Sequence, residues 1–275
     1  MSTIREPAVA GMFYESDAKT LKSDIISLMK NLPEEKYEDI FGIVVPHAGY
    51  IYSGRTAAFA YNIIKQKKIK TAVIISPSHR EYFPGICIFN GDAYKTPLGL
   101  VEIDTAKSAV LISKSNLIFE GTNGHKAEHA VEVHLPFLQM INEKIKIVPA
   151  VMGDQRKEFV DALAEAVAAV WDEETIVIAS SDLSHFYSSS VADKLDAVAE
   201  KKISDFDYEG FQKALNENQC EACGGGGIAA LLKAAYILGF KKSKILSRTH
   251  SGMVSGKNHE VVGYLSAVIY GRNDE

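Results

Sequence analysis

The chain has 275 residues, of which 47% are hydrophobic, so it can bury a large core within one α/β domain. A formal net charge of −5 and an isoelectric point near 5.9 give no electrostatic footprint for nucleic-acid binding. The N-terminus lacks the layout of a signal peptide, and no apolar run approaches the roughly 18 to 20 residues of a membrane span. We therefore expect a cytoplasmic protein with no nucleic-acid and no membrane partner.

Cysteine usage points to the same compartment. The three cysteines, Cys87, Cys220 and Cys223, are an odd number in a long chain, which fits a reducing environment better than a disulfide framework. Cys220 and Cys223 form a C-x-x-C pair, which is typical of a redox pair or of half a zinc site. Because the chain has no second C-x-x-C, cysteine alone cannot complete a zinc tetrad, and a redox role of Cys220 with Cys223 stays open.

Hydrophobic periodicity predicts an alternation of strands and helices. In chain order we expect a packed arm at 5–14, a helix capped at 16–17, a strand at 43–45, a helix at 54–65, a strand from 72 to 76, a short strand at 86–89, helical segments at 105–113 and 127–142, a strand at 146–152, a helix at 159–170, a strand at 175–179, helices at 192–206, 208–216 and 227–238, and a final strand at 261–270. The first strand–helix–strand unit favours a parallel pair. With no repeat or linker to mark a boundary, we expect a single α/β domain over residues 1–275.

Three of the predicted strands end in a histidine. His47, His79 and His185 each follow an apolar run, and Asp182 lies just ahead of His185. Because ligands of open α/β sheets bind beyond the carboxyl ends of the strands, these side chains are candidates for a metal site. A single histidine at a strand end is more often an ordinary hydrogen-bonded residue. Three in the same topological place favour a shared site.

Cys223 is the fourth candidate. It precedes the glycine run 224–227, which opens a predicted helix whose partial positive end favours a thiolate. The alternative is a buried cysteine that acts as a small hydrophobe. The glycines could bind an anion through their amides, but without a Walker-type lysine close packing of the helix is the better interpretation.

A second cluster lies at 124–136, where Glu128 and Glu132 are four residues apart and are expected to share a helix face, with His129 close to it. The spacing does not match H-E-x-x-H. A role in support of the main site or in substrate binding, and a solvated charged face, remain alternatives. Aromatic residues that flank the proposed ligands, Tyr52 among them, could form the wall of a pocket or belong to the core.

Several ordered motifs resemble the Memo family. They are Arg5-Glu6-Pro7-Ala8-Val9-Ala10-Gly11-Met12-Phe13-Tyr14, Pro46-His47-Ala48-Gly49-Tyr50 with Tyr52-Ser53-Gly54, Ser76-Pro77-Ser78-His79, Glu128-His129 with Glu132 and His134-Leu135-Pro136, Ser180-Ser181-Asp182-Leu183-Ser184-His185, and Cys223-Gly224. The resemblance runs from the N-terminal arm to the last strand.

Prokaryotic members of this family are called AmmeMemoRadiSam system protein B, which implies a functional link to a radical-SAM protein and an AMMECR1-like protein. The resemblance also implies the three-layer α/β/α fold of class III extradiol dioxygenases of the LigB type, with a mostly parallel or mixed central sheet. Those enzymes hold non-haem Fe(II) with two histidines and a glutamate. By position, His47 and His79 match the histidines, Cys223 stands where the glutamate belongs, and His185 matches the acid/base residue, with Asp182 beside it.

The resemblance leaves three functions open. The first is a redox or dioxygenase-like metalloenzyme with metal at His47, His79 and Cys223 and with His185 and Asp182 as catalytic residues. Because thiolate is softer than carboxylate, Fe(II) or copper is expected and zinc also fits. Tyr52, Glu128, His129 and His134 would lie in the substrate pocket or behind the ligands.

The second is a non-catalytic module that binds a peptide in the same cleft; eukaryotic Memo proteins are regarded as signalling adaptors, which favours this alternative by analogy. The third is a hydrolase with Cys223 as nucleophile and His185 and Asp182 as base and orienting group. The unknown partner is accordingly a small molecule or a peptide.

Overall fold

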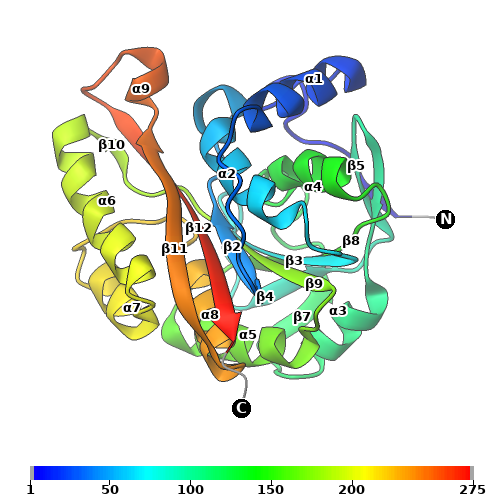
Figure 1. Ribbon diagram of the computed structural model, residues 1–275. Helices are drawn as coiled ribbons and strands as arrows, with labels where there is room; N and C mark the ends of the chain where they lie inside the picture. The colour runs from blue at the N-terminus through cyan, green and yellow to red at the C-terminus, as the bar shows by residue number, and fades with distance from the viewer. Residues whose placement is uncertain (1–2, 273–275) are drawn as a thin grey trace.

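A mixed sheet forms the centre of the computed structural model, which describes residues 3–272 (Figure 1). The strands run in the order β10-β12-β2-β9-β3-β8-β4-β7, and β11 pairs with β12. Their bounds are β2 Gly42–Val45, β3 Thr71–Pro77, β4 Ile86–Phe89, β7 Ile118–Gly121, β8 Lys146–Met152, β9 Thr175–Ser180, β10 His185–Tyr187, β11 Phe240–His250 and β12 Val261–Arg272. The central strands β2, β9, β3 and β8 are parallel, whereas β12 and β4 join them antiparallel.

A second, small sheet has the order β1-β5-β6. Its strands are β1 Ile4–Arg5, β5 Ala93–Thr96 and β6 Gly99–Glu102. It ties the start of the chain to its middle, because β1 pairs with β5. The expectation that the N-terminal arm packs against the body is confirmed, since Arg5, Val9 and Tyr14 are buried.

Helices cover both faces of the large sheet, which confirms the α/β class. Successive strand residues point to opposite faces, so Ile176 and Ile178 of β9 enter one core while Val177 and Ala179 enter the other. The helices of the first core are α1 Ala18–Met29, α2 Arg55–Ile64 and α4 Leu135–Ile141, after the short helical turns η1 Tyr50–Gly54 and η2 Glu132–His134. Those of the second are α3 Thr105–Ile112, α5 Lys157–Val170, α6 Ser189–Ser204, α7 Tyr208–Asn216 and α8 Gly225–Ile237, and α9 Gly252–Ser255 follows β11.

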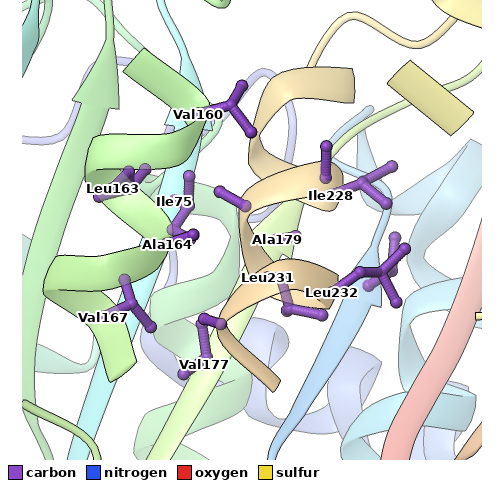
Figure 2. Packing of buried hydrophobic residues seen from close by; sticks show 14 of the residues in the cluster. Ile75, Val160, Leu163, Ala164, Val167, Val177, Ala179, Ile228, Leu231 and Leu232 are labelled. Carbon is purple, nitrogen blue, oxygen red and sulfur yellow. The ribbon is translucent and has the colours of Figure 1, made fainter. Parts of the chain in front are cut away.

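In the second core, α5 and α8 pack against each other over β3 and β9 (Figure 2). Leu163 and Val167 of α5 and Leu231 of α8 belong to this core, and all three side chains are fully buried. Each such side chain stabilises the fold by roughly 1.5–3 kcal/mol relative to an exposed one. This packing holds α8 against the sheet, and with it Cys223, which lies two residues before the first residue of the helix.

Most element predictions are confirmed, but two differ, and several strands had no prediction. The parallel strands β2 and β3 are not neighbours, because β9 lies between them. The helix predicted from 127 begins only with η2 and α4, since the Glu128 side chain accepts the N–H groups of His129 and Ala130 and so bends the backbone away from a helix. Glu128 and Glu132 therefore do not share a helix face. Strand β11 was not predicted, and neither were the short strands β1, β5, β6, β7 and β10.

The first helix shows the predicted capping. Asp17 is the N-cap of α1, and its Oδ1 accepts the N–H of Thr20 at 2.8 Å. Among the helices within residues 3–272, none is both long and apolar enough to cross a membrane.

Candidate metal centre

The carboxyl ends of three adjacent strands bring the candidate ligands together. His47 follows β2, His79 follows β3, and β9, which ends at Ser180 just before Asp182, lies between them. Cys223 reaches the same place from the loop before α8. One donor atom each of His47, His79 and Cys223 lies within 4.8 Å of the others, and Cys223 Sγ is 3.1 Å from His47 Nε2.

This donor set fits a metal ion. Bonds of about 2.0–2.1 Å to imidazole nitrogen and about 2.3 Å to thiolate sulfur place tetrahedral ligand atoms roughly 3.3–3.8 Å apart. The separation of 3.1 Å between Cys223 Sγ and His47 Nε2 is just below that range, and the three donor atoms all lie within 4.8 Å of one another. Two nitrogens and one sulfur are the donors of zinc, copper and non-haem iron sites, and a set of three leaves positions for a further ligand.

The tautomer of His47 follows from a buried hydrogen-bond network. Ser180 Oγ donates its one proton to the carbonyl of Ala130 at 2.7 Å, so it can only accept from the imidazoles beside it. His47 Nδ1 lies 2.8 Å and His134 Nε2 2.7 Å from that oxygen, and Tyr61 donates to His134 Nδ1 at 2.9 Å. His47 is therefore protonated at Nδ1, and the lone pair of its Nε2 faces Cys223.

Burial keeps this network neutral. It lowers the pKa of His134 to about 3 and holds the pKa of His47 well below its ordinary value. Neutral imidazole is the form that binds metal. His134, which the sequence placed in the pocket or behind the ligands, lies behind His47 and is linked to it through Ser180.

His79 is supported by a carboxylate. Its backbone N–H donates to Glu128 Oε2 at 2.6 Å, and its Nδ1 lies 2.9 Å from Glu128 Oε1. The Glu128 side chain is only 1% exposed, so this bond is shielded from water. A proton on His79 Nδ1 that points at the carboxylate leaves Nε2 free, which is the usual arrangement of a metal-binding histidine.

His129 stacks on His79 and forms part of the cavity wall. Their ring centroids are 4.8 Å apart with 21° between the planes, and the His129 ring is also 5.3 Å from His47. Burial lowers the pKa of His129 to about 4. The cavity above the histidines has a volume of about 600 Å³, and its wall includes Phe13, Tyr52 and His185.

Asp182 holds the backbone of the site. Its Oδ1 accepts the N–H of His47 at 2.8 Å, its own N–H donates to Cys223 Sγ at 3.3 Å, and its carbonyl accepts the N–H of Cys223 at 3.2 Å. Burial raises the pKa of the Asp182 carboxyl to about 7 and also raises the pKa of the Cys223 thiol. Gly224 allows this close approach, because a Cβ there would lie 2.1 Å from the Ser180 carbonyl oxygen.

His185 lies between two cavities. It lines the 600 Å³ cavity and also a second one of about 410 Å³ on the α7–α8 side, which Cys220 and Cys223 line as well. Burial lowers the pKa of His185. Among residues 3–272, the hydrogen bonds of the Asp182 carboxylate go to the backbone at His47 and Ala48. Asp182 thus supports His47 rather than His185.

Three residues of the site environment were not among the predicted site residues. Ser180 lies behind His47, and Arg5 and Glu132 form a buried ion pair behind Glu128. Ser180 and Glu132 lie in motifs that the sequence analysis singled out, yet their roles depend on contacts across the fold. Arg5 opens another of these motifs, and apart from Glu6 it is the one charged residue of the arm 5–14.

Fold and site together define an α/β protein with a His₂Cys cluster at the carboxyl edge of its sheet. The sequence profile described as "Memo-like protein" matches residues 5–268. A MEMO1 family protein of Thermoplasma volcanium is 38% identical over 266 residues, covering 96% of this chain and 98% of that relative. A MEMO1 family protein of Nitrosopumilus maritimus is 35% identical over 268 residues, covering 95% and 98%.

The chain therefore belongs to the Memo family. The crystal structure of an uncharacterized protein from Escherichia coli K12 shares the fold, with a TM-score of 0.55 over 84% of this chain and all of that one, at 12% identity.

Proposed function

We propose that this Memo-family protein binds one redox-active metal ion, iron or copper, through His47, His79 and Cys223 and acts as a dioxygenase-like oxidoreductase. The observation that carries the proposal is the convergence of the three donor atoms within 4.8 Å, each imidazole having a partner on its far nitrogen. Zinc would fit the same donors.

The bound metal and the residues around it would have separate roles in this function. A bound iron or copper ion would supply one-electron and Lewis-acid chemistry. Phe13 and Tyr52 line the cavity and would exclude water from a small organic ligand. His185, whose lowered pKa keeps it neutral at pH 7, would accept a proton from a ligand hydroxyl through an imidazole nitrogen.

Metal analysis of protein purified without oxygen tests the proposal. We expect about one iron or copper ion per wild-type chain, and almost none in His47→Ala or Cys223→Ser, because each variant removes one of three protein ligands. His259→Ala, which removes an exposed histidine outside the site, is the control and should retain the metal. Equal metal content in His47→Ala and the wild type would contradict the assignment.

A peptide-binding module without turnover is the second candidate. It is favoured by the exposed apolar side chains at the mouth of the cavity, where Met12 and Ile51 are each 72% and Phe186 is 73% exposed. His185→Ala separates the two candidates, since it would abolish turnover in an enzyme but change only affinity in a module.

The Cys223-dependent hydrolase has less support. A nucleophilic cysteine needs a lowered pKa, whereas burial raises the pKa of Cys223, and Asp182 is bonded to His47 rather than to His185. Rapid alkylation of Cys223 below pH 8 in metal-free protein would favour the hydrolase; slow labelling would count against it.

A further inference from the structure

The N-terminal arm, residues 3–14, forms an unusual set of contacts behind the candidate metal centre. Arg5 is 5% exposed, and its guanidinium pairs with Glu132, whose side chain is fully buried. The same guanidinium stacks over the Tyr94 ring, with its central carbon 5.0 Å from the ring centroid. Arginine is rarely buried unless it is fully partnered. Each of its three guanidinium nitrogens has a hydrogen-bond partner, and these partners indicate which parts of the fold Arg5 positions.

Arg5 holds the backbone that carries Glu128. Its Nε donates to the carbonyl of His125 at 3.1 Å, and its Nη2 donates to the carbonyl of Glu128 itself. The segment 125–131 is not helical and has few backbone hydrogen bonds of its own to fix it. The hydrogen bonds from Arg5 therefore fix the conformation of this segment on the side that faces away from His79. On the near side, the Glu128 carboxylate binds the N–H and Nδ1 of His79.

Glu132 fixes the arm in return. Its two carboxylate oxygens accept the N–H groups of Ala8 and Val9, at 2.7 and 3.0 Å, and the O–H of Tyr14 at 2.5 Å. The fixed arm places Phe13 against His129, with ring centroids 4.8 Å apart. One ion pair thus supports both imidazoles of the His79–His129 stack.

We infer that Arg5 is a positioning residue for the metal ligand His79, acting through the backbone and carboxylate of Glu128. The inference rests on the proposed metal-binding function, but it concerns a residue outside the ligand set. Arg5 acts by geometry: without it, segment 125–131 relaxes, Glu128 shifts away from His79, and the His79 ring loses the bond that orients its free nitrogen toward the site.

Arg5→Lys is the most informative variant, because lysine keeps a positive charge beside Glu132 but has one nitrogen in place of the three that bond Glu132 and the two carbonyls. Co²⁺, titrated against a chromophoric chelator, serves as the metal probe. We expect Arg5→Lys to bind Co²⁺ about 10–100-fold more weakly than the wild type, as for other losses of ligand support. In the metal-free protein, the His79 Nδ1–H proton should exchange with solvent faster.

The control is Leu111→Ala, which weakens the packing of α3 in the second core, away from α8 and Cys223, and should leave Co²⁺ affinity unchanged. Equal affinity in Arg5→Lys and the wild type would overturn this inference alone, whereas a wild type that binds no Co²⁺ would overturn the proposed function and this inference with it. If Arg5→Lys does not fold, Tyr14→Phe, which removes one bond to Glu132, must weaken Co²⁺ binding in the same direction, and unchanged binding there would equally refute the inference.

Discussion

The amino ends and the carboxyl ends of the parallel strands differ in how deeply their polar side chains are buried. At the amino ends of β3, β8 and β9, a cavity of about 480 Å³ is bordered by ion pairs, such as Lys70 with Glu174 at 2.8 Å, whose side chains are largely exposed. At the carboxyl ends, His47, Glu128 and Glu132 are almost fully buried. Water solvates the first set, whereas every member of the second needs a partner within the protein.

This difference has a consequence for function. Exposed ion pairs tolerate movement because water replaces a lost partner. Buried groups do not, so the carboxyl end is held in one geometry by fixed hydrogen bonds, which is what a metal centre or catalytic site requires. The contrast can be tested by removing matching groups at the two ends.

The largest effect is expected from the Arg5–Glu132 pair. Glu132→Ala leaves a buried guanidinium without its carboxylate, so the free energy of unfolding should fall by about 3–5 kcal/mol. Urea denaturation measures it. Glu174→Ala removes an exposed carboxylate at the other end and should cost about 0–1 kcal/mol. Similar losses in the two variants would remove the distinction between the ends.

A smaller loss is expected at Ser180. Ser180→Ala deprives His47 Nδ1, His134 Nε2 and the Ala130 carbonyl of their partner, and we expect about 2–3 kcal/mol of destabilisation. Metal affinity should fall about 10–100-fold, because His47 is no longer held in one tautomer. The control is Ser108→Ala, since the Ser108 hydroxyl is buried without a partner among residues 3–272 and its removal should be nearly neutral. Wild-type stability in Ser180→Ala would show that the network does not constrain His47.

The smallest effect should have the opposite sign. Phe186, next to His185, has a φ of +64°, which is unfavourable for a bulky residue, and its side chain is 73% exposed. Phe186→Gly should raise the free energy of unfolding by roughly 0.5–1 kcal/mol, because glycine adopts this backbone without strain. Leu100→Gly, at an exposed strand position without a left-handed backbone, should lower it. A loss of stability in Phe186→Gly would mean that the side chain contributes packing at the mouth of the cavity.

The sequence was sufficient for the parts of the fold that depend on local pattern. Strand β8 and the cap at Asp17 match the prediction because apolar runs and capping residues are local signals. Strand β11 was not predicted because its sequence is rich in lysine and serine and shows no apolar alternation. Its pairing with β12 stabilises it instead. Likewise, the position of β9 between β2 and β3 depends on long-range strand pairing, which the local sequence pattern does not indicate.

In the candidate site, too, some residues could be predicted from local pattern and others could not. His47, His79 and Cys223 could be singled out because strand ends and glycine runs are visible in one sequence, and the structure brings them together. Their identity as metal ligands stays a prediction. The support from Arg5 and Ser180 could not be derived, since Arg5 lies more than 120 residues from Glu128 and Ser180 differs in no local feature from its neighbour Ser181.

The place of β2 in the sheet sets the order in which this site can form during synthesis. His47 lies at the end of a strand whose two neighbours, β9 and β12, are made more than 120 residues later. The nascent chain therefore displays its two imidazoles long before the thiol of Cys223 leaves the ribosome. Contacts of such sequence separation form slowly. A metal ion that is bound by all three residues can therefore be acquired only by a nearly complete chain. It then competes with any ion that is already bound to His47 and His79.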